Sequence, residues 1–243
     1  INIADDEDLM ELIVDAGFET IFVGIETPNE KSLEECGKWH NKNRDMLKSI
    51  HKIQQYGLEV QGGFIVGFDN DTPSIFDQMI KFVQESSIPT AMVGLLNALP
   101  DTKLYHRLKK EGRLFNKTSG NNTDFSVNFI PTMKPQTLIE GYRKVMQTIY
   151  SPKHYYSRAK GLLINLGSKQ QKLFHVRYNY IMALFKSILH IGILGRERFH
   201  YWKFFFYSLF KHPKRFPYAI TLSIYGYHFR RMVKKLMKAN KLQ

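Results

Sequence analysis

TIFVGIET, residues 20–27, and VQGGFIVGFDND, residues 60–71, are the two stretches that decide the fold. Each is an apolar run that contains glycine and ends near an acidic residue. Near-continuous apolar strands are typical of parallel sheets that are covered on both faces. Because ligands of parallel β/α proteins lie at the carboxyl ends of the strands, Glu26 and Asp69 stand where such a ligand would bind.

Helical patterns alternate with these strands along the chain. Apolar residues recur at helical spacing over residues 9–16, 46–53 and 75–83, and glycines at positions 17 and 57 follow the first two helices. We expect Asp71 or Thr72 to cap the third helix, with Pro73 at its first position. A third strand over residues 90–99 leads into a helix over residues 103–112. The alternation predicts parallel βα units, in a (β/α) barrel or an open doubly wound sheet.

Composition divides the chain into two unlike parts. The 243 residues have a net charge of +13, but residues 1–150 hold 16 Lys and Arg against 21 Asp and Glu. Residues 151–243 hold 19 Lys and Arg against a single acid, Glu197. One cysteine, Cys36, excludes an internal disulfide framework and any cluster held by several thiolates of this chain. A reducing, cytoplasmic compartment is expected.

Glycines at the strand ends allow two interpretations. Gly24, Gly62, Gly63 and Gly67 lack a Cβ, so a ligand can approach the backbone there. Glycine in a strand also marks bulges and barrel bends, and an acid after a strand also caps helices. The sequence lacks G-x-G-x-x-G, H-E-x-x-H, G-x-S-x-G and P-loop motifs, which argues against dinucleotide, zinc-protease, hydrolase and P-loop chemistry. Cys36 is interpreted as an incidental or packing thiol rather than a nucleophile.

Three longer segments together resemble a known family. AGFETIFVGIETPNEKSLEECGKWHN, GLEVQGGFIVGFDNDT and LLNALPDTKLYHRLKKEGRL are similar in order and spacing to the second half of a radical SAM domain. The most similar group is the cobalamin-binding radical SAM proteins that include hopanoid methylases and related lipid or tetrapyrrole enzymes. LIEGYRKVMQTIYSPKHYYSRAKGLL resembles the extension that follows the core in that group.

The resemblance implies a fold, cofactors and a binding set. The fold is the carboxyl-terminal part of a partial (β/α)6 barrel followed by a mainly helical basic extension. In the family, a [4Fe–4S] cluster held by C-x-x-x-C-x-x-C reduces S-adenosylmethionine to a 5′-deoxyadenosyl radical, and some members also use cobalamin. Glu26 matches a position near the ribose or amino-acid moiety of S-adenosylmethionine, and Ile65 and Gly67 match positions against its adenine. The implied cofactor-binding set is Gly24, Glu26, Gly63, Ile65, Gly67 and Asn97, and no catalytic residue is assigned.

The chain departs from the family pattern in one important respect. It has no C-x-x-x-C-x-x-C, so it supplies no metal ligand, and we expect the cluster ligands and the first three strands upstream of Ile1 in a longer protein. The missing amino-terminal half is then a partner, and the chain alone is expected to be inactive. The predicted division is a barrel part over residues 1–115, a connecting loop over 116–134 and a helical extension over 135–243.

Aromatic and basic residues interleave in the second part, and three interpretations remain open. The helices could pack their aromatic side chains on the barrel, dock on an anionic membrane surface, or bind nucleic acid, for which no motif is present. We expect a cationic face that associates weakly with membranes, on the inner surface.

Two function classes follow for the whole protein. One is a radical SAM enzyme that acts on a small hydrophobic lipid or tetrapyrrole-like substrate by methyl transfer or oxidative chemistry. The other is a non-catalytic basic interaction module on an α/β scaffold.

Overall fold

A three-stranded parallel sheet organises the molecule. The computed structural model describes residues 1–115, 126–167 and 178–239. The strands are β1 (Thr20–Glu26), β2 (Glu59–Val66) and β3 (Ala91–Leu95), and they lie side by side in sequence order. This confirms the predicted α/β class, and consecutive neighbouring strands are the arrangement of a barrel wall.

Helices of the first part begin and end largely where local signals predict. They are α1 (Glu7–Asp15), α2 (Glu30–Glu35), α3 (Met46–Gln55), α4 (Ile75–Glu85) and α5 (Lys103–Lys110). Asp45 caps α3 by accepting a hydrogen bond from the Lys48 amide at 2.9 Å, and Thr102 caps α5 in the same way. Gly17 and Gly57 end α1 and α3 with φ values of 91° and 100°, which glycine adopts without a steric penalty.

The predicted start of α4 was wrong. The helix begins at Ile75 after Ser74, and Thr72 and Pro73 precede it in a turn. The Asp71 carboxylate instead accepts hydrogen bonds from the Gly67 and Phe68 amides, at 2.9 and 3.1 Å, and from the Ser32 hydroxyl at 2.8 Å. Asp71 therefore closes the turn that follows β2 and does not act as the N-cap of α4.

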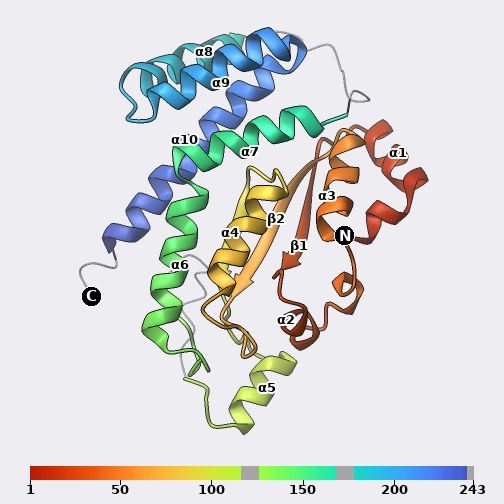
Figure 1. Ribbon diagram of the computed structural model, residues 1–243, viewed down its shortest axis with the longest axis vertical. Helices are drawn as coiled ribbons and strands as arrows, with labels where there is room; N and C mark the ends of the chain where they lie inside the picture. Colours follow the sequence, from red (N-terminus) through yellow and green to blue (C-terminus); the bar gives the residue numbers. More distant parts are fainter. Residues whose placement is uncertain (116–125, 168–177, 240–243) are drawn as a thin grey trace.

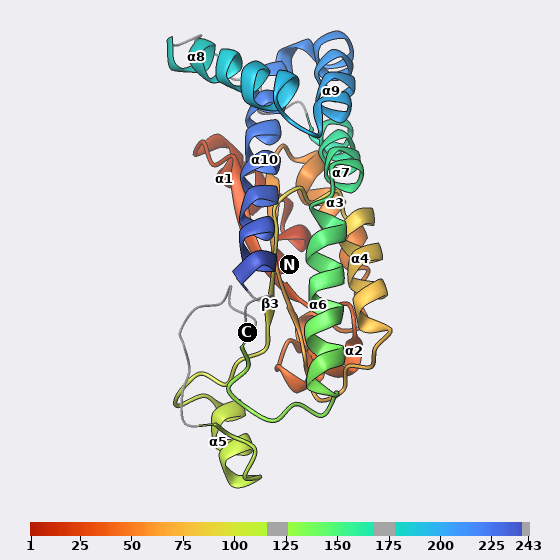
Figure 2. The same ribbon diagram turned by 90° about the vertical axis from the view of Figure 1, so that its left-hand side faces the viewer.

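The described part of residues 135–239 is helical, as predicted. It contains α6 (Pro135–Ile149), α7 (Pro152–Asn165), α8 (Tyr178–Ser187), a π-helical segment (Ile188–Ile193), α9 (Arg198–Lys211) and α10 (Phe216–Ala239). In Figure 1, α6 lies beside α4, α7 crosses the amino ends of the strands, and α8 and α9 form an outer layer beyond it. Figure 2 shows α10 running back from that layer along the sheet, on the side away from α4.

Helix α6 protects the outer edge of the sheet. The hydroxyls of Tyr142 and Tyr150 donate to the carbonyls of Val93 and Ala91 on β3, at 3.0 and 2.7 Å. An edge strand presents unpaired backbone groups that invite pairing with another chain. The two tyrosines satisfy the carbonyls of this edge in the places where a further strand would otherwise bind.

One hydrophobic core extends across both parts of the chain. It includes Met10 and Ile25 from the first part, Leu138 and Tyr155 from the extension, and Val233 from α10. Buried Arg158 on α7 also donates to the Ile88 carbonyl at 2.8 Å, just before β3. The predicted division at residues 115 and 135 stays a prediction, and residues 116–125 of the predicted loop lie outside the described part. Within the described residues, no helix has the length and apolar character needed to cross a bilayer.

Candidate functional site

The two faces of the sheet have different surroundings. Side chains such as Ile25 and Phe64 point toward the helices, where the Phe64 ring packs edge-on against Phe82 of α4 at 6.0 Å between centroids. Gly24, Gly63 and Met92 belong to the opposite face and line a cavity of about 510 Å³. Ligand pockets commonly measure roughly 300–1,000 Å³. This cavity is therefore the candidate site.

Helix α10 forms the second wall of the cavity. Phe229, Met232 and Leu236 line it opposite the strands, at a spacing that places them on one side of the helix. Tyr142 and Met146 of α6, and Tyr150 directly after it, close the side next to β3. Apolar side chains therefore surround most of the cavity, and polar groups enter it from the strand ends.

Glu26 occupies the end of β1 in an unusual conformation. Its φ is +66°, and the pairing with β2 shifts register between Gly24 and Glu26. A non-glycine residue held in the left-handed region costs on the order of 1–3 kcal/mol and is frequent at functional sites. The bulge turns the Glu26 carboxylate back over its own strand, where it lines the cavity.

The absence of a Cβ at Gly24 makes room for this carboxylate. A Cβ at that position would lie 2.7 Å from Glu26 Oε1 and 3.3 Å from Lys38 Nζ. Lys38 Nζ lies 3.2 Å from Glu26 Oε1, so the carboxylate that lines this end of the cavity is ion-paired. Gly24 therefore positions Glu26 through the space that it leaves.

The structure brings five of the six predicted site residues together. Gly24, Glu26, Gly63, Ile65 and Asn97 all line the cavity, and their role in binding a cofactor stays a prediction. Asn97 also accepts a hydrogen bond from the Asn128 backbone amide at 3.1 Å, so it ties the segment around Asn128 to the end of β3. Gly67 lies apart, facing Leu138, and its φ of +105° serves the turn closed by Asp71.

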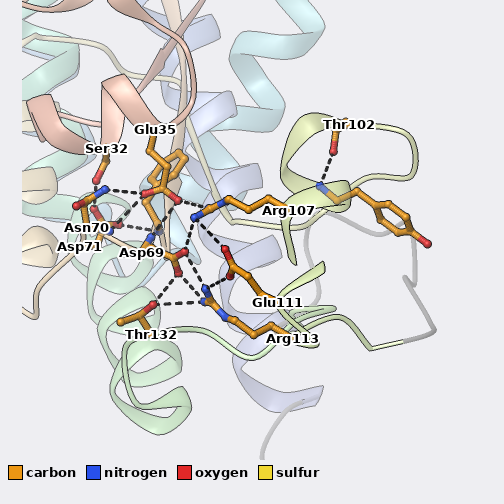
Figure 3. Close-up of polar contacts among 12 residues, drawn as sticks. Ser32, Glu35, Asp69, Asn70, Asp71, Thr102, Arg107, Glu111, Arg113 and Thr132 are labelled. Carbon is orange, nitrogen blue, oxygen red and sulfur yellow. Dashed lines mark hydrogen bonds and ion pairs between the residues drawn. The ribbon is translucent and has the colours of Figure 1, made fainter. Parts of the chain in front are cut away.

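A charged network joins the loops at the carboxyl ends of the strands (Figure 3). Arg113 binds Asp69 through two hydrogen bonds of 2.9 and 2.6 Å, and Thr132 donates to Asp69 at 2.7 Å. Arg107 bridges Asp69 and Glu35 at 2.9 and 2.7 Å. The hydrogen bond from Arg113 is the main reason that the pKa of Asp69 falls to about 2. Asp69 thus connects α5 and the segment after it to the sheet. Both oxygens of its carboxylate already accept hydrogen bonds from Arg107, Arg113 and Thr132.

The described residues do not fit an iron–sulfur cluster. No group of three or more His, Cys, Asp or Glu side chains is arranged for a metal in the parts of the chain that the structure describes. Cys36 follows α2, its thiol donates to the Leu33 carbonyl at 3.4 Å, and burial raises its pKa. Cys36 is nevertheless an exposed residue, so the structure does not support a packing role for it, and the raised pKa lowers the thiolate character that a nucleophile needs.

Two family models match the chain. The model described as "Domain of unknown function (DUF4070)" matches residues 102–241, which is more than half of the chain. The model of the radical SAM superfamily matches residues 2–83, which contain β1, β2 and Glu26. The chain belongs to the radical SAM superfamily. The family is one of enzymes that use S-adenosylmethionine and a [4Fe–4S] cluster. The residues that match the DUF4070 model contain α5 to α10.

Curated proteins agree with this membership. An uncharacterized methyltransferase of Synechocystis sp. is 35% identical over 232 residues, which are 94% of this radical SAM chain and 43% of the relative. The hopanoid C-2 methylase of Rhodopseudomonas palustris is 34% identical over 211 residues, covering 84% of this chain and 39% of the relative. A bacteriochlorophyllide d C-8(2)-methyltransferase of Chlorobaculum tepidum is 28% identical over 113 residues, covering 46% and 25%. The chain spans about two fifths of the length of the first two relatives.

Sequence reasoning missed two contributors to the site. Lys38 follows a short helix in an unremarkable polar stretch, and no local pattern connects it to Glu26. The cavity wall on α10 shows a helical apolar spacing at Phe229, Met232 and Leu236, but that spacing does not reveal which surface they meet. Both contributions depend on contacts between distant segments.

Proposed function

We propose that this chain forms the S-adenosylmethionine pocket and the substrate-facing wall of a radical SAM methyltransferase with a hydrophobic polycyclic substrate. The observation that carries the proposal is the cavity between the sheet and α10, which is polar at the tip of β1 and apolar along α10. A site with convergent polar groups at one end and apolar walls elsewhere suits a ligand that is half polar and half apolar.

The cofactor end of the cavity offers the groups that S-adenosylmethionine needs. The Glu26 carboxylate accepts hydrogen bonds from hydroxyls or an ammonium group, and Lys38 beside it holds a carboxylate or orients Glu26. The Phe22 ring covers the backbone at Gly63, where its nearest carbon lies 2.8 Å from the place of a Cβ, so a flat ligand ring would reach Gly63 by displacing Phe22. When bound, S-adenosylmethionine supplies the methyl group or the radical chemistry of the family.

The substrate end is lined by apolar side chains. Met92 on β3 and Phe229, Met232 and Leu236 on α10 present hydrocarbon and one aromatic ring to the cavity. The named relatives methylate a hopanoid and a bacteriochlorophyllide, according to their descriptions. Both names support a lipid or tetrapyrrole-like substrate for this chain. Cobalamin as a methyl carrier is part of the same proposal, and its absorption spectrum in the purified complete protein tests it.

The test is S-adenosylmethionine binding by the complete protein with its cluster reconstituted. Calorimetry should find that Glu26→Gln weakens binding by about tenfold to a hundredfold, because one charge-assisted hydrogen bond contributes about 1.5–3 kcal/mol. Glu30→Gln removes an exposed carboxylate from the start of α2 and is the matched control, with unchanged affinity expected. Equal affinity of Glu26→Gln and the unmodified protein would remove Glu26 from the cofactor site.

A further inference from the structure

Exposed apolar side chains concentrate on the α8–α9 layer. Among the residues that the structure describes, nine of the twenty large hydrophobic side chains that are exposed lie between residues 178 and 211. A large apolar patch on a protein surface usually marks a place of interaction. The concentration therefore distinguishes this layer from the scattered exposed residues elsewhere.

The exposed side chains follow the helices as two stripes. Ile181, Phe185, Leu189 and Ile193 recur every four residues along α8 and the π-helical segment, and all four are exposed. On α9, Phe199 and Phe210 are 76% and 75% exposed, and Phe206 between them is also exposed. Spacings of three and four residues keep such side chains on one side of a helix.

Basic residues accompany the stripes, and exposed acids do not. Lys186, Arg196, Arg198, Lys203 and Lys211 are exposed on the same layer. Glu197, the sole acid in residues 151–243, is buried and paired with Arg230 at 3.0 Å. The layer therefore offers apolar surface and positive charge with no exposed carboxylate to oppose an anionic partner.

We propose that the α8–α9 layer docks on an anionic lipid membrane. Amphipathic helices with aromatic and apolar residues next to Lys and Arg insert their apolar side into the headgroup boundary while the bases meet anionic headgroups. Trp202, Phe206 and Phe210 follow one another along α9 with nearly parallel rings, whose centroids are 5.5 and 6.3 Å apart. Trp and Phe on the apolar side of a basic helix are typical of helices that lie in the membrane interface.

The position of the layer is compatible with docking. Figures 1 and 2 show α8 and α9 at one end of the molecule and α5, with the loops at the carboxyl ends of the strands, at the other. Contact of α8 and α9 with a membrane leaves the loops joined by Asp69 and Arg113 unobstructed. The inference is independent of the reaction proposed above.

Co-sedimentation of the complete protein with vesicles tests the inference. We expect binding to an equal mixture of phosphatidylcholine and phosphatidylglycerol but not to phosphatidylcholine alone. Raising the salt from physiological strength to 1 M shortens the Debye length from about 8 Å to about 3 Å and should release much of the protein. Lys203→Glu with Lys211→Glu should weaken binding by at least about 25-fold, since each base near an anionic surface contributes about fivefold.

Matched variants separate docking from unfolding. Phe199→Ser with Phe210→Ser should also abolish binding with an unchanged unfolding temperature, because both side chains are exposed. Leu9→Ser with Leu12→Ser on α1, and Lys109→Glu with Lys110→Glu on α5, change exposed residues elsewhere and should bind vesicles normally. Equal binding to neutral vesicles, no binding, or equal loss in the control variants overturns the inference. Light scattering would also contradict the inference if it showed that the unmodified protein is a dimer that does not bind vesicles and that Phe199→Ser with Phe210→Ser converts it to a monomer.

Discussion

At the scale of single residues, the end of β1 depends on one glycine and one strained glutamate. Glu26 is held at a positive φ, and its carboxylate occupies the space that a side chain at Gly24 would fill. Strain of this kind persists where the surroundings determine the conformation. Here the β-bulge and the ion pair with Lys38 are those surroundings.

Gly24→Ala should therefore impair the site while leaving the fold intact. The added methyl group would displace the Glu26 carboxylate, which is the movable end of a side chain, so the free energy of unfolding should change by less than about 1 kcal/mol. S-adenosylmethionine affinity measured by calorimetry should fall by about tenfold.

A double variant distinguishes this explanation from a direct contact at Gly24. If Gly24 acts through Glu26, then Gly24→Ala combined with Glu26→Gln should bind no more weakly than the worse single variant. If the losses of affinity in the two single variants were additive in the double variant, the backbone of Gly24 would contact the cofactor independently of Glu26.

At the scale of elements, α10 is anchored by a buried ion pair. Arg230 on α10 donates through Nε and Nη2 to Glu197, at 3.2 and 3.0 Å, and both side chains are 6% exposed. The guanidinium also lies 5.6 and 5.5 Å from the ring centroids of Tyr155 and Tyr156 on α7. Three helices thus meet at Arg230, next to the stretch of α10 that lines the cavity.

Glu197→Ala should destabilise the protein by about 3–5 kcal/mol in chemical denaturation, because it leaves a buried positive charge without its partner. Adding Arg230→Met should restore most of that loss. The exposed pair of Lys144 and Asp77 offers a comparison, and Asp77→Ala there should cost less than about 1 kcal/mol. A loss below 1 kcal/mol for Glu197→Ala as well would show that water reaches the buried pair.

The elements differ in how far the sequence predicts them. Strands and caps rest on local signals, and Asp45 and Thr102 cap the helices that immediately follow them. Asp71 was misassigned because amides on both sides of it in the sequence can bind its carboxylate. In the structure the preceding Gly67 and Phe68 amides bind it, and those of α4 do not. The α10 wall could not be predicted, since Phe229 lines the cavity together with strands more than 130 residues away in the chain. Helical periodicity predicts an apolar side but does not name its neighbour.

At the scale of the whole molecule, one buried carboxylate connects the sheet to α10. Glu59 at the start of β2 is buried and accepts a hydrogen bond from the Tyr218 hydroxyl. Burial raises the pKa of Glu59 above its ordinary value of 4.5, although the hydrogen bonds from Tyr218 and Gln61 oppose this. The folded state therefore favours the protonated acid.

A raised pKa contributes stability that is fully present below the unfolded value near 4.5 and is lost as the pH rises through the folded value. Glu59→Gln should consequently raise the unfolding temperature at pH 7 and have little effect at pH 4. Glu19→Gln, at an exposed position just before β1, should show no such pH-dependent gain. A lower unfolding temperature for Glu59→Gln at pH 7 would mean that the folded protein prefers the charged form.

The place of α10 in the cavity also has a consequence for the order of synthesis. The ribosome releases β1, β2 and β3 long before the wall that carries Phe229, Met232 and Leu236. During that interval Phe22 and Met92 have no α10 beside them, and the nascent sheet presents its cavity-facing surface to water or to a chaperone. The pocket is thus completed last, when α10 packs against strands that lie far before it in the chain. Because contacts between distant residues form slowly, we expect the pocket to close only after all of its helices have been translated.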